Sequence, residues 1–253
     1  MMTMRTSLLI TILQSFLAIR ASVALAANPS MELKYFDIRG KGELARIIFA
    51  LADVEYTDTR FEITPGTFSS PSFDEAKASG DLVMNLARAP VLVTPGGQVF
   101  GQSASIERYL CRKLGFMGET DEEGACIDCV AEHCRDVSDA QMRKGFSMFA
   151  KDKTEDEKAQ LRTEWFEKDM PSMLEKIEEV VKLTSDAEGY AVGKTNSYAD
   201  VVIFKLLKDC MSSDTESVTK ASKDCKTLTE IAERVSNDEN VAKWVKERPE
   251  SMF

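Results

Sequence analysis

One tyrosine in the first half of the chain occupies a position that suits ligand binding as well as simple packing. Tyr35 ends a run in which Met31 and Leu33 alternate with polar residues, the pattern of a strand with one buried face. Gly40 and Gly42 then lead into apolar residues at helical spacing. Loops that follow the carboxyl ends of strands are where α/β proteins tend to bind ligands. Tyr35 is therefore a candidate ligand-binding residue, with simple packing in the strand as the alternative.

All six cysteines lie after residue 110, so the first half has no protein thiol with which to attack a disulfide. Cys126, Cys129 and His133 fall on one helix face, and zinc binds cysteine and histidine. One helix supplies only three ligands, however, and a free cysteine also packs as a small hydrophobe, so we predict no metal. Cys210 and Cys225 flank a polar loop and are a candidate disulfide in an oxidising compartment, although the sequence leaves the connectivity open.

The composition is that of an ordinary soluble globular protein. The 253 residues are 43% hydrophobic and 29% charged, which is enough for one large domain or two small ones. The formal net charge is −10 and there is no basic stripe, so nucleic acid and anionic lipid are poor candidate partners. We therefore expect a small-molecule substrate or a protein partner, without nucleic acid or a membrane.

The first 26 residues have the pattern of a secretory signal peptide. Arg5 supplies the positive end, residues 8–19 form a short apolar stretch, and residues 24–26 give a small-x-small cleavage site. The apolar stretch is too short to span a membrane. We expect entry into the secretory pathway or export. A cytoplasmic protein with an apolar extension, or an organellar presequence, is the alternative because Arg20 interrupts the apolar tail.

The elements that must position Tyr35 follow in the order βαβ and then ββα. Residues 55–61 read as a second strand after the helix, which implies a parallel pair. Residues 90–93 and 98–100 flank a proline-glycine turn and predict a hairpin, and a helix begins near Ser103. The free amides at such a helix start bind anions, and a serine there can cap the helix.

The second half of the chain reads as helical. Residues 154–157 and 197–200 have capping-box patterns that predict two helix starts. Pro171 predicts a kink or a restart in a long helix, and residues 240–246 predict a short final helix.

Three motifs of the first half stand in register. They are Tyr35-Phe36-x-x-Arg39-Gly40-x-x-Glu43-x-x-Arg46, Ala89-Pro90-Val91-Leu92 and Gln102-Ser103-x-x-Ile106-x-x-Tyr109-Leu110. Together they resemble the motifs of the glutathione S-transferases, closest to the sigma class and its relatives, which include prostaglandin D synthases. The resemblance covers nearly the whole chain after the signal sequence. It implies an α/β plus all-α fold, with a thioredoxin-like glutathione-binding domain at residues 31–114 and an all-helical C-terminal domain at residues 119–253.

The resemblance also implies how glutathione would bind. Tyr35 is similar to the tyrosine that donates a hydrogen bond to the sulfur. Ala89 resembles the residue whose backbone pairs with the cysteinyl moiety, and Pro90 the cis-proline that follows it. Gln102 and Ser103 resemble the pair that holds the γ-glutamyl carboxylate at a helix terminus.

The resemblance implies five other residues of the glutathione site, and two of them, Lys41 and Phe73, depart from the family pattern. Lys77 and Arg88 resemble basic residues near the glycine carboxylate, and Phe36 belongs to the first motif. Lys41 stands where the sigma class often has an arginine, so its help to the thiolate is at most that of a point charge. Phe73 replaces a common tryptophan, which removes an indole donor. Residues 62–89 are longer than in the usual pattern by roughly ten.

Asp128 resembles the aspartate that reaches the ammonium group of the glutathione on a partner subunit. This implies a homodimer with composite sites, with a solvated helix carboxylate as the alternative. The implied activity, which serves detoxification, is attack of the glutathione thiolate on electrophilic, mostly apolar small molecules. Two alternatives stay open, a glutathione-dependent isomerase of the prostaglandin D synthase type and a non-catalytic binding or structural protein on the same fold.

Overall fold

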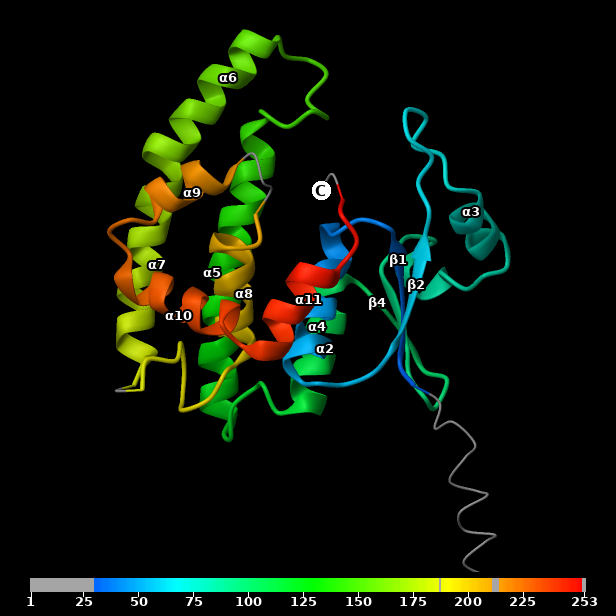
Figure 1. The fold of residues 1–253 in the computed structure, drawn as a ribbon, viewed down its shortest axis with the longest axis horizontal. Helices are drawn as coiled ribbons and strands as arrows, with labels where there is room; N and C mark the ends of the chain where they lie inside the picture. The colour runs from blue at the N-terminus through cyan, green and yellow to red at the C-terminus, as the bar shows by residue number, and fades with distance from the viewer. Residues whose placement is uncertain (1–29, 187, 211–213, 252–253) are drawn as a thin grey trace, which may run out of the picture.

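The computed structural model describes residues 30–186, 188–210 and 214–251, and it consists of a small sheet with its helices beside a larger group of helices (Figure 1). The predicted signal sequence at residues 1–26 lies outside the described residues. No helix in the part of the chain that the structure describes is long and apolar enough to cross a membrane.

The N-terminal part is a mixed sheet with the strand order β2-β1-β3-β4. β1 (Glu32–Phe36) runs parallel to β2 (Thr57–Phe61), and α2 (Glu43–Leu51) connects the two strands. β3 (Val91–Val93) lies antiparallel to both β1 and β4 (Val99–Gly101). The predicted order of elements is therefore confirmed, and the second strand begins two residues later than expected.

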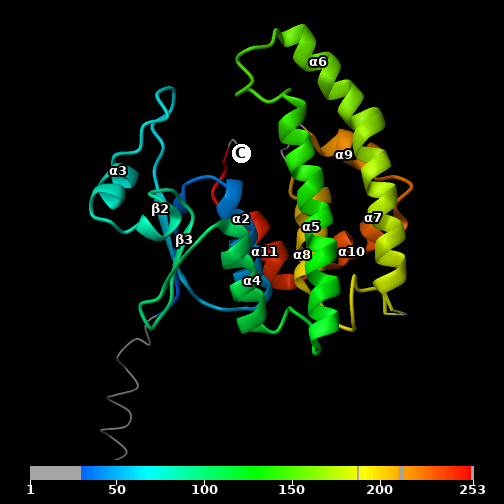
Figure 2. The same ribbon diagram turned by 180° about the vertical axis from the view of Figure 1, so that it is seen from behind.

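The two faces of the sheet have different cover. α2 and α4 (Ser103–Leu114) lie on the face toward the helical part, and α3 (Pro71–Ala78) lies on the other (Figures 1 and 2). A 3₁₀ turn, η2 (Val83–Asn85), joins α3 to β3. Leu33 on β1 is fully buried against α2 and α4, as the alternation of polar and apolar residues in that strand predicted.

The C-terminal part is all-helical, as expected, and its helices surround a central one. That helix is α8 (Tyr198–Leu207), whose N-terminus carries the predicted capping box between Ser197 and Asp200. The capping box predicted at Thr154 is also present. The other helices are α5 (Asp121–Lys144), α6 (Glu155–Glu164), α7 (Met170–Thr184), α9 (Thr215–Ala221), α10 (Lys226–Ser236) and α11 (Glu239–Glu247).

A π-helical turn, η3 (Trp165–Asp169), joins α6 to α7, and Pro171 lies in the first turn of α7. Pro171 lacks an N–H, so it cannot continue an undisturbed ladder of helix hydrogen bonds. The predicted kink or restart at this proline is therefore confirmed.

One apolar core runs through both parts of the molecule. It includes Leu33 and Ile47 from the sheet part as well as Ile127 on α5 and Ile203 on α8. α11 packs against α2, so the last described helix lies beside a helix of the sheet part (Figure 1). Burial of this shared apolar surface holds the sheet and the helices in one arrangement.

Candidate active site

Tyr35 lies at the end of β1, with its ring packed beneath the turn η1 (Gly40–Gly42). The residue is 6% exposed, and its phenolic oxygen accepts the backbone N–H of Lys41 at 2.9 Å. A Cβ at Gly40 would lie 2.6 Å from that oxygen, and one at Gly42 would lie 2.5 Å from the ring. Glycine is therefore required at both positions, because any side chain would collide with the tyrosine.

The surroundings of Tyr35 keep its phenol protonated at neutral pH. Burial raises its pKa, and this outweighs the opposing effects of the Lys41 amide and of the nearby Arg46 charge. The phenolic oxygen already accepts a hydrogen bond from Lys41, which leaves its own proton free to be donated. The Tyr35 hydroxyl is thus available as a hydrogen-bond donor and is not a base at neutral pH.

Arg46 on α2 holds the segment between β1 and η1, the turn that covers Tyr35. Its fully buried guanidinium donates to the carbonyls of Phe36 at 3.2 Å and Ile38 at 2.7 Å. It also pairs with Glu43 at 3.3 Å and with Asp58 at 3.1 Å. Hydrogen bonds to a charged group inside a protein hold a loop more firmly than neutral ones.

A second segment of the candidate site contains Ala89 and Pro90, just before β3. The peptide bond between them is cis, as the family resemblance predicted. The neighbouring Gln102 has a φ of +65°, a value that L-residues rarely adopt, and α4 begins at the next residue, Ser103. No side chain among the described residues caps this helix start, so its first amides stay available to an anion.

Five more predicted site residues lie around these segments. Phe36 packs against Phe73 of α3, with ring centroids 4.8 Å apart, in a small apolar cluster on the outer face of the sheet. Lys77 is exposed and holds its ammonium 5.7 Å from the Phe73 ring centroid. The side chains of Lys41 and Arg88 are also exposed. The positive charges are therefore at the surface, and Phe73 serves first as a packing residue.

A contact that the sequence did not predict joins the end of the chain to the tyrosine loop. We name Trp244, Arg248 and Ser251 the C-terminal latch. Trp244 and Arg248 donate to the buried Glu43 carboxylate at 2.9 and 2.7 Å. The Ser251 hydroxyl accepts the backbone N–H of Arg39 at 3.1 Å, four residues after Tyr35.

Asp209, two residues after the end of α8, contacts both Arg248 of the C-terminal latch and Arg39 of the tyrosine loop. Its buried carboxylate accepts from Arg248 at 2.5 Å and from Arg39 at 3.3 Å, and it pairs with Lys205 at 3.0 Å. Burial raises the pKa of Asp209, but the positive charges of Lys205 and Arg248 outweigh it and keep the pKa below its usual value.

The family model of the glutathione S-transferase C-terminal domain matches residues 140–248. "Glutathione S-transferase 1" of Ascaris suum is 31% identical over 228 residues, which are 89% of this chain and 100% of that relative. The chain belongs to the glutathione S-transferase family. "Glutathione S-transferase 3" of Caenorhabditis elegans is 28% identical over 88% of this chain and 98% of its own. The crystal structure of the glutathione S-transferase from Ascaris lumbricoides has a TM-score of 0.67 and 29% identity, covering 89% of this chain and 100% of that one.

Three other matches bear on finer questions within the glutathione S-transferase family. "S-crystallin 4" of Enteroctopus dofleini is 24% identical over 89% of this chain and 100% of its own. The "prostaglandin synthase D" structure of Nilaparvata lugens has a TM-score of 0.66, and a structure described as a monomeric glutathione S-transferase of Necator americanus has one of 0.67. These two cover 88% of this chain and 100% of theirs, at 22% and 24% identity, so they show the fold alone.

Enzymes of this family use glutathione as a co-substrate, and the chain is one of them. The predicted site residues of this glutathione S-transferase that lie at the sheet fall into two groups. Tyr35 and its loop form one group, and the strand of Pro90 with the helix start at Ser103 forms the other. β1 and β3 are neighbours in the sheet, which brings these two groups together.

Asp128 lies apart from them on α5 and is paired within its own chain. Arg108 of α4 donates to its carboxylate at 2.8 Å, and Arg112 lies 3.8 Å from it. A glutathione ammonium from another subunit would therefore have to compete with Arg108 for this carboxylate.

The cysteines of this transferase are all free, so the candidate disulfide between Cys210 and Cys225 is wrong. Cys225 is buried, and the Cys210 thiol faces Thr215 instead, 3.9 Å from its hydroxyl. The Cys129 sulfur lies 3.4 Å from the imidazole of His133. Among the residues that the structure describes, no group of three or more histidine, cysteine or acidic side chains could hold a metal ion.

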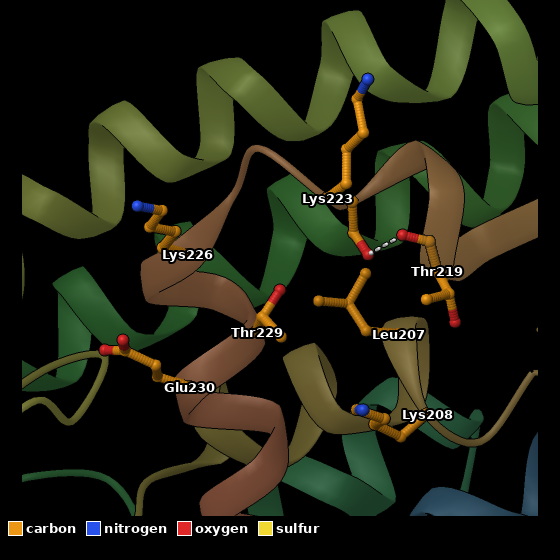
Figure 3. A pocket seen from close by; sticks show the side chains of 8 residues that line it. Leu207, Lys208, Thr219, Lys223, Lys226, Thr229 and Glu230 are labelled. Carbon is orange, nitrogen blue, oxygen red and sulfur yellow. Dashed lines mark hydrogen bonds between the residues drawn. The ribbon is translucent and has the colours of Figure 1, made fainter.

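A hollow of about 280 Å³ lies between α8, α9 and α10, and none of the predicted site residues lines it (Figure 3). Figure 3 shows the ammonium groups of Lys223 and Lys226 pointing in different directions, and Lys208 is paired with Glu233. The charged groups that line the hollow do not converge on one point, so we assign no ligand to the hollow. The hollow is lined by Leu207, Lys208, Thr219, Ser222, Lys223, Lys226, Thr229 and Glu230.

Proposed function

We propose that this glutathione S-transferase conjugates the glutathione thiolate to electrophilic, mostly apolar small molecules, with Tyr35 as the donor to the sulfur. In the reaction the thiol proton leaves to solvent, the sulfur forms a bond to the electrophilic carbon, and the displaced group departs with its electron pair. The observation that carries the proposal is the buried, protonated phenol of Tyr35, whose oxygen is anchored by Lys41 while its own proton is free. A fixed donor of this kind favours the thiolate over the thiol.

The second group of residues would bind the peptide part of glutathione. The backbone of Ala89 would pair with the cysteinyl moiety in the manner of an added strand. The first amides of α4, together with Gln102 and Ser103, would hold the γ-glutamyl carboxylate. The exposed cations Arg88 and Lys77 would attract the glycine carboxylate. Phe36 and Phe73 pack together on the outer face of the sheet, and Lys41, which is exposed, would add a positive charge near the sulfur.

The test is turnover of an aryl halide with glutathione by the purified chain. We expect saturable, glutathione-dependent conjugation that the Tyr35→Phe variant loses in large part at neutral pH. Retention on a glutathione resin without turnover of any electrophile would favour the non-catalytic alternative that the S-crystallin match raises. Conversion of a prostaglandin endoperoxide without net consumption of glutathione would favour the isomerase.

We also propose a homodimer. The turn η2 and the residue after it support this proposal, because the side chains of Val83, Met84 and Leu86 are 70%, 59% and 77% exposed. Side chains of this kind gain free energy when a second copy covers them. The test is the molar mass in solution by light scattering, where Leu86→Ser should shift a dimer toward the monomer and the exposed Leu183→Ser, on α7, should not. A monomer at all concentrations would refute the proposal.

Asp128 would complete the neighbouring subunit's site in such a dimer. We expect Asp128→Ala to weaken glutathione binding about tenfold or more while the dimer persists, because a charged hydrogen bond is lost. An unchanged affinity would show that Asp128 only pairs with Arg108.

We propose further that residues 1–26 direct the chain into the secretory pathway and are then removed. The sequence pattern is the support for this proposal. The mature protein should begin near Ala27 or Asn28, which N-terminal mass spectrometry of protein recovered from cells can establish. An abundant form that still begins at Met1 would refute it, and one that begins at Met31 would indicate a cytoplasmic form.

A further inference from the structure

Asn85 connects the backbone segments to which we assign the glutathione contacts. It is the last residue of η2 and is 4% exposed. Its side-chain nitrogen donates to the carbonyl of Pro90 at 2.9 Å, and its side-chain oxygen accepts the backbone N–H of Gln102 at 3.2 Å. The amide orientation follows from these partners, because one is an acceptor and the other a donor. One buried side chain thus joins the Pro90 strand to the start of α4.

The backbone of Asn85 adds a third connection. Its carbonyl accepts the N–H of Arg88 at 3.0 Å. Between them, Leu86 and Ala87 have φ values of +52° and +58°, in the left-handed region that non-glycine residues seldom occupy. Backbone of this kind persists only where its surroundings hold it in place. Asn85 therefore also anchors the bend that presents Arg88.

The fit around Asn85 is too close for another side chain to enter. A Cβ at Gly101 would lie 2.6 Å from the Asn85 Cβ and 2.6 Å from the Met84 carbonyl oxygen. The end of β4 therefore runs directly against η2, and Gln102 follows at once in its unusual conformation. The distance between η2 and the start of α4 is set by this contact and by the Asn85 hydrogen bonds together.

We propose that Asn85 is a positioning residue for glutathione, which keeps the cysteinyl seat at Ala89 and the γ-glutamyl seat at Gln102 and Ser103 at the spacing of one tripeptide. This inference rests on the function proposed above. Two seats on separate segments bind one ligand well only when their spacing is fixed in advance, because otherwise binding has to order them. Asn85 does not touch the sulfur, so its effect is on binding rather than on the thiolate.

The experiment compares Asn85→Ala with the wild-type chain. We expect the KM for glutathione to rise about tenfold, as for the loss of buried hydrogen bonds. The kcat at saturating glutathione and the pKa of the bound thiol should stay close to wild type, because Tyr35 and its loop are held by Arg46 instead. A merely structural role would lower the melting temperature without this separation of KM from kcat.

Thr94→Val is the matched control. The Thr94 hydroxyl is bound within the β3–β4 turn, where it accepts the Gln98 N–H at 3.1 Å and donates to the Gln98 side chain at 2.8 Å. Its removal also loosens the sheet but leaves the spacing of the two seats unchanged. Thr94→Val should therefore lower the melting temperature and leave the glutathione KM at the wild-type value.

A KM within twofold of wild type in Asn85→Ala, or an equal rise in Thr94→Val, would overturn the inference. A wild-type chain that neither binds glutathione nor conjugates it would instead overturn the proposed function. If Asn85→Ala fails to fold, Asn85→Ser replaces it, because the serine hydroxyl keeps one polar group at the position. Asn85→Ser should then raise the glutathione KM by a smaller factor, and a wild-type KM in it would equally overturn the inference.

Discussion

Replacing Tyr35 by phenylalanine removes one hydroxyl from the centre of the proposed mechanism. The ring stays beneath Gly40 and Gly42, since it is packed there, and the Lys41 amide loses its acceptor. The change therefore removes both the proposed hydrogen bond to the sulfur and the one that Lys41 donates, so the melting temperature is measured beside the kinetics to separate the two effects.

The size of the expected effect follows from the buried position of the phenol. A hydrogen bond to a charged acceptor contributes about 1.5–3 kcal/mol, which corresponds to a thiol pKa lowered by about 1–2 units. A free thiol with a pKa of about 8.5 is about 3% thiolate at pH 7. A two-unit decrease raises this to roughly three quarters, about 25-fold more.

Ionisation alone nevertheless explains little of the rate. Nucleophilicity falls with the pKa, which removes roughly six- to tenfold of that gain. A net gain of about two- to fourfold remains at pH 7, so the donor must contribute mainly by fixing the sulfur toward the acceptor. We expect Tyr35→Phe to reduce turnover at pH 7 by about ten- to a hundredfold and to change glutathione affinity by no more than about a few-fold.

The assay is kcat/KM as a function of pH, together with the ultraviolet absorbance of the bound thiolate. Without its donor the thiol has a higher pKa, so less thiolate is present at pH 7 and raising the pH should restore part of the activity. Tyr56→Phe is the control, because the Tyr56 hydroxyl has no hydrogen-bond partner among the described residues. Normal turnover of Tyr35→Phe at pH 7 would refute the reasoning, and Lys41 or Arg39 would be tested next.

Three further outcomes concern the rest of the chain. Arg248→Ala removes one hydrogen-bond donor from each of the buried carboxylates of Glu43 and Asp209. The free energy of unfolding in urea should therefore fall by about 2–4 kcal/mol; an unchanged midpoint would contradict this. Asp209 has a lowered pKa, so its stabilisation is present above the unfolded pKa of about 3.9 and is lost as the pH falls through the folded value. Asp209→Asn should therefore flatten the acid limb of stability against pH, and an acid limb parallel to wild type would refute it. Iodoacetamide should label the exposed Cys129 first in peptide maps of the native protein, because burial raises the pKa of Cys134 to about 12 and that of Cys225 to about 11; equal labelling of Cys134 would oppose this.

Local signals carried most of the fold. The alternation around Leu33 placed β1, and the capping pattern at Ser197 and Asp200 placed the start of α8, because each depends on residues within one turn or strand. The family resemblance predicted the cis bond before Pro90 in the same way, from a short motif, and the structure confirms that bond. The role of Tyr35 stays a prediction.

The parts that the sequence did not reveal depend on distant contacts. Asn85 has no motif of its own, and its role comes from a carbonyl five residues away and an amide seventeen residues away. Glu43 and Arg248 meet across 205 positions, so no local pattern connects them. The disulfide expected between Cys210 and Cys225 failed for a related reason, since spacing around a loop does not say which way each thiol points.

The C-terminal latch decides where a label or a solid support can be attached to this enzyme. Ser251 contacts the backbone at Arg39, beyond the Phe36 end of β1, so a tether added at the carboxyl terminus would pull on the loop that covers Tyr35. β1 begins at Glu32, roughly 13 Å away along the strand. An affinity tag or biosensor linkage placed between residue 26 and residue 30 keeps that distance from the Phe36 end of β1, and it is the attachment that should preserve the activity of an immobilised enzyme.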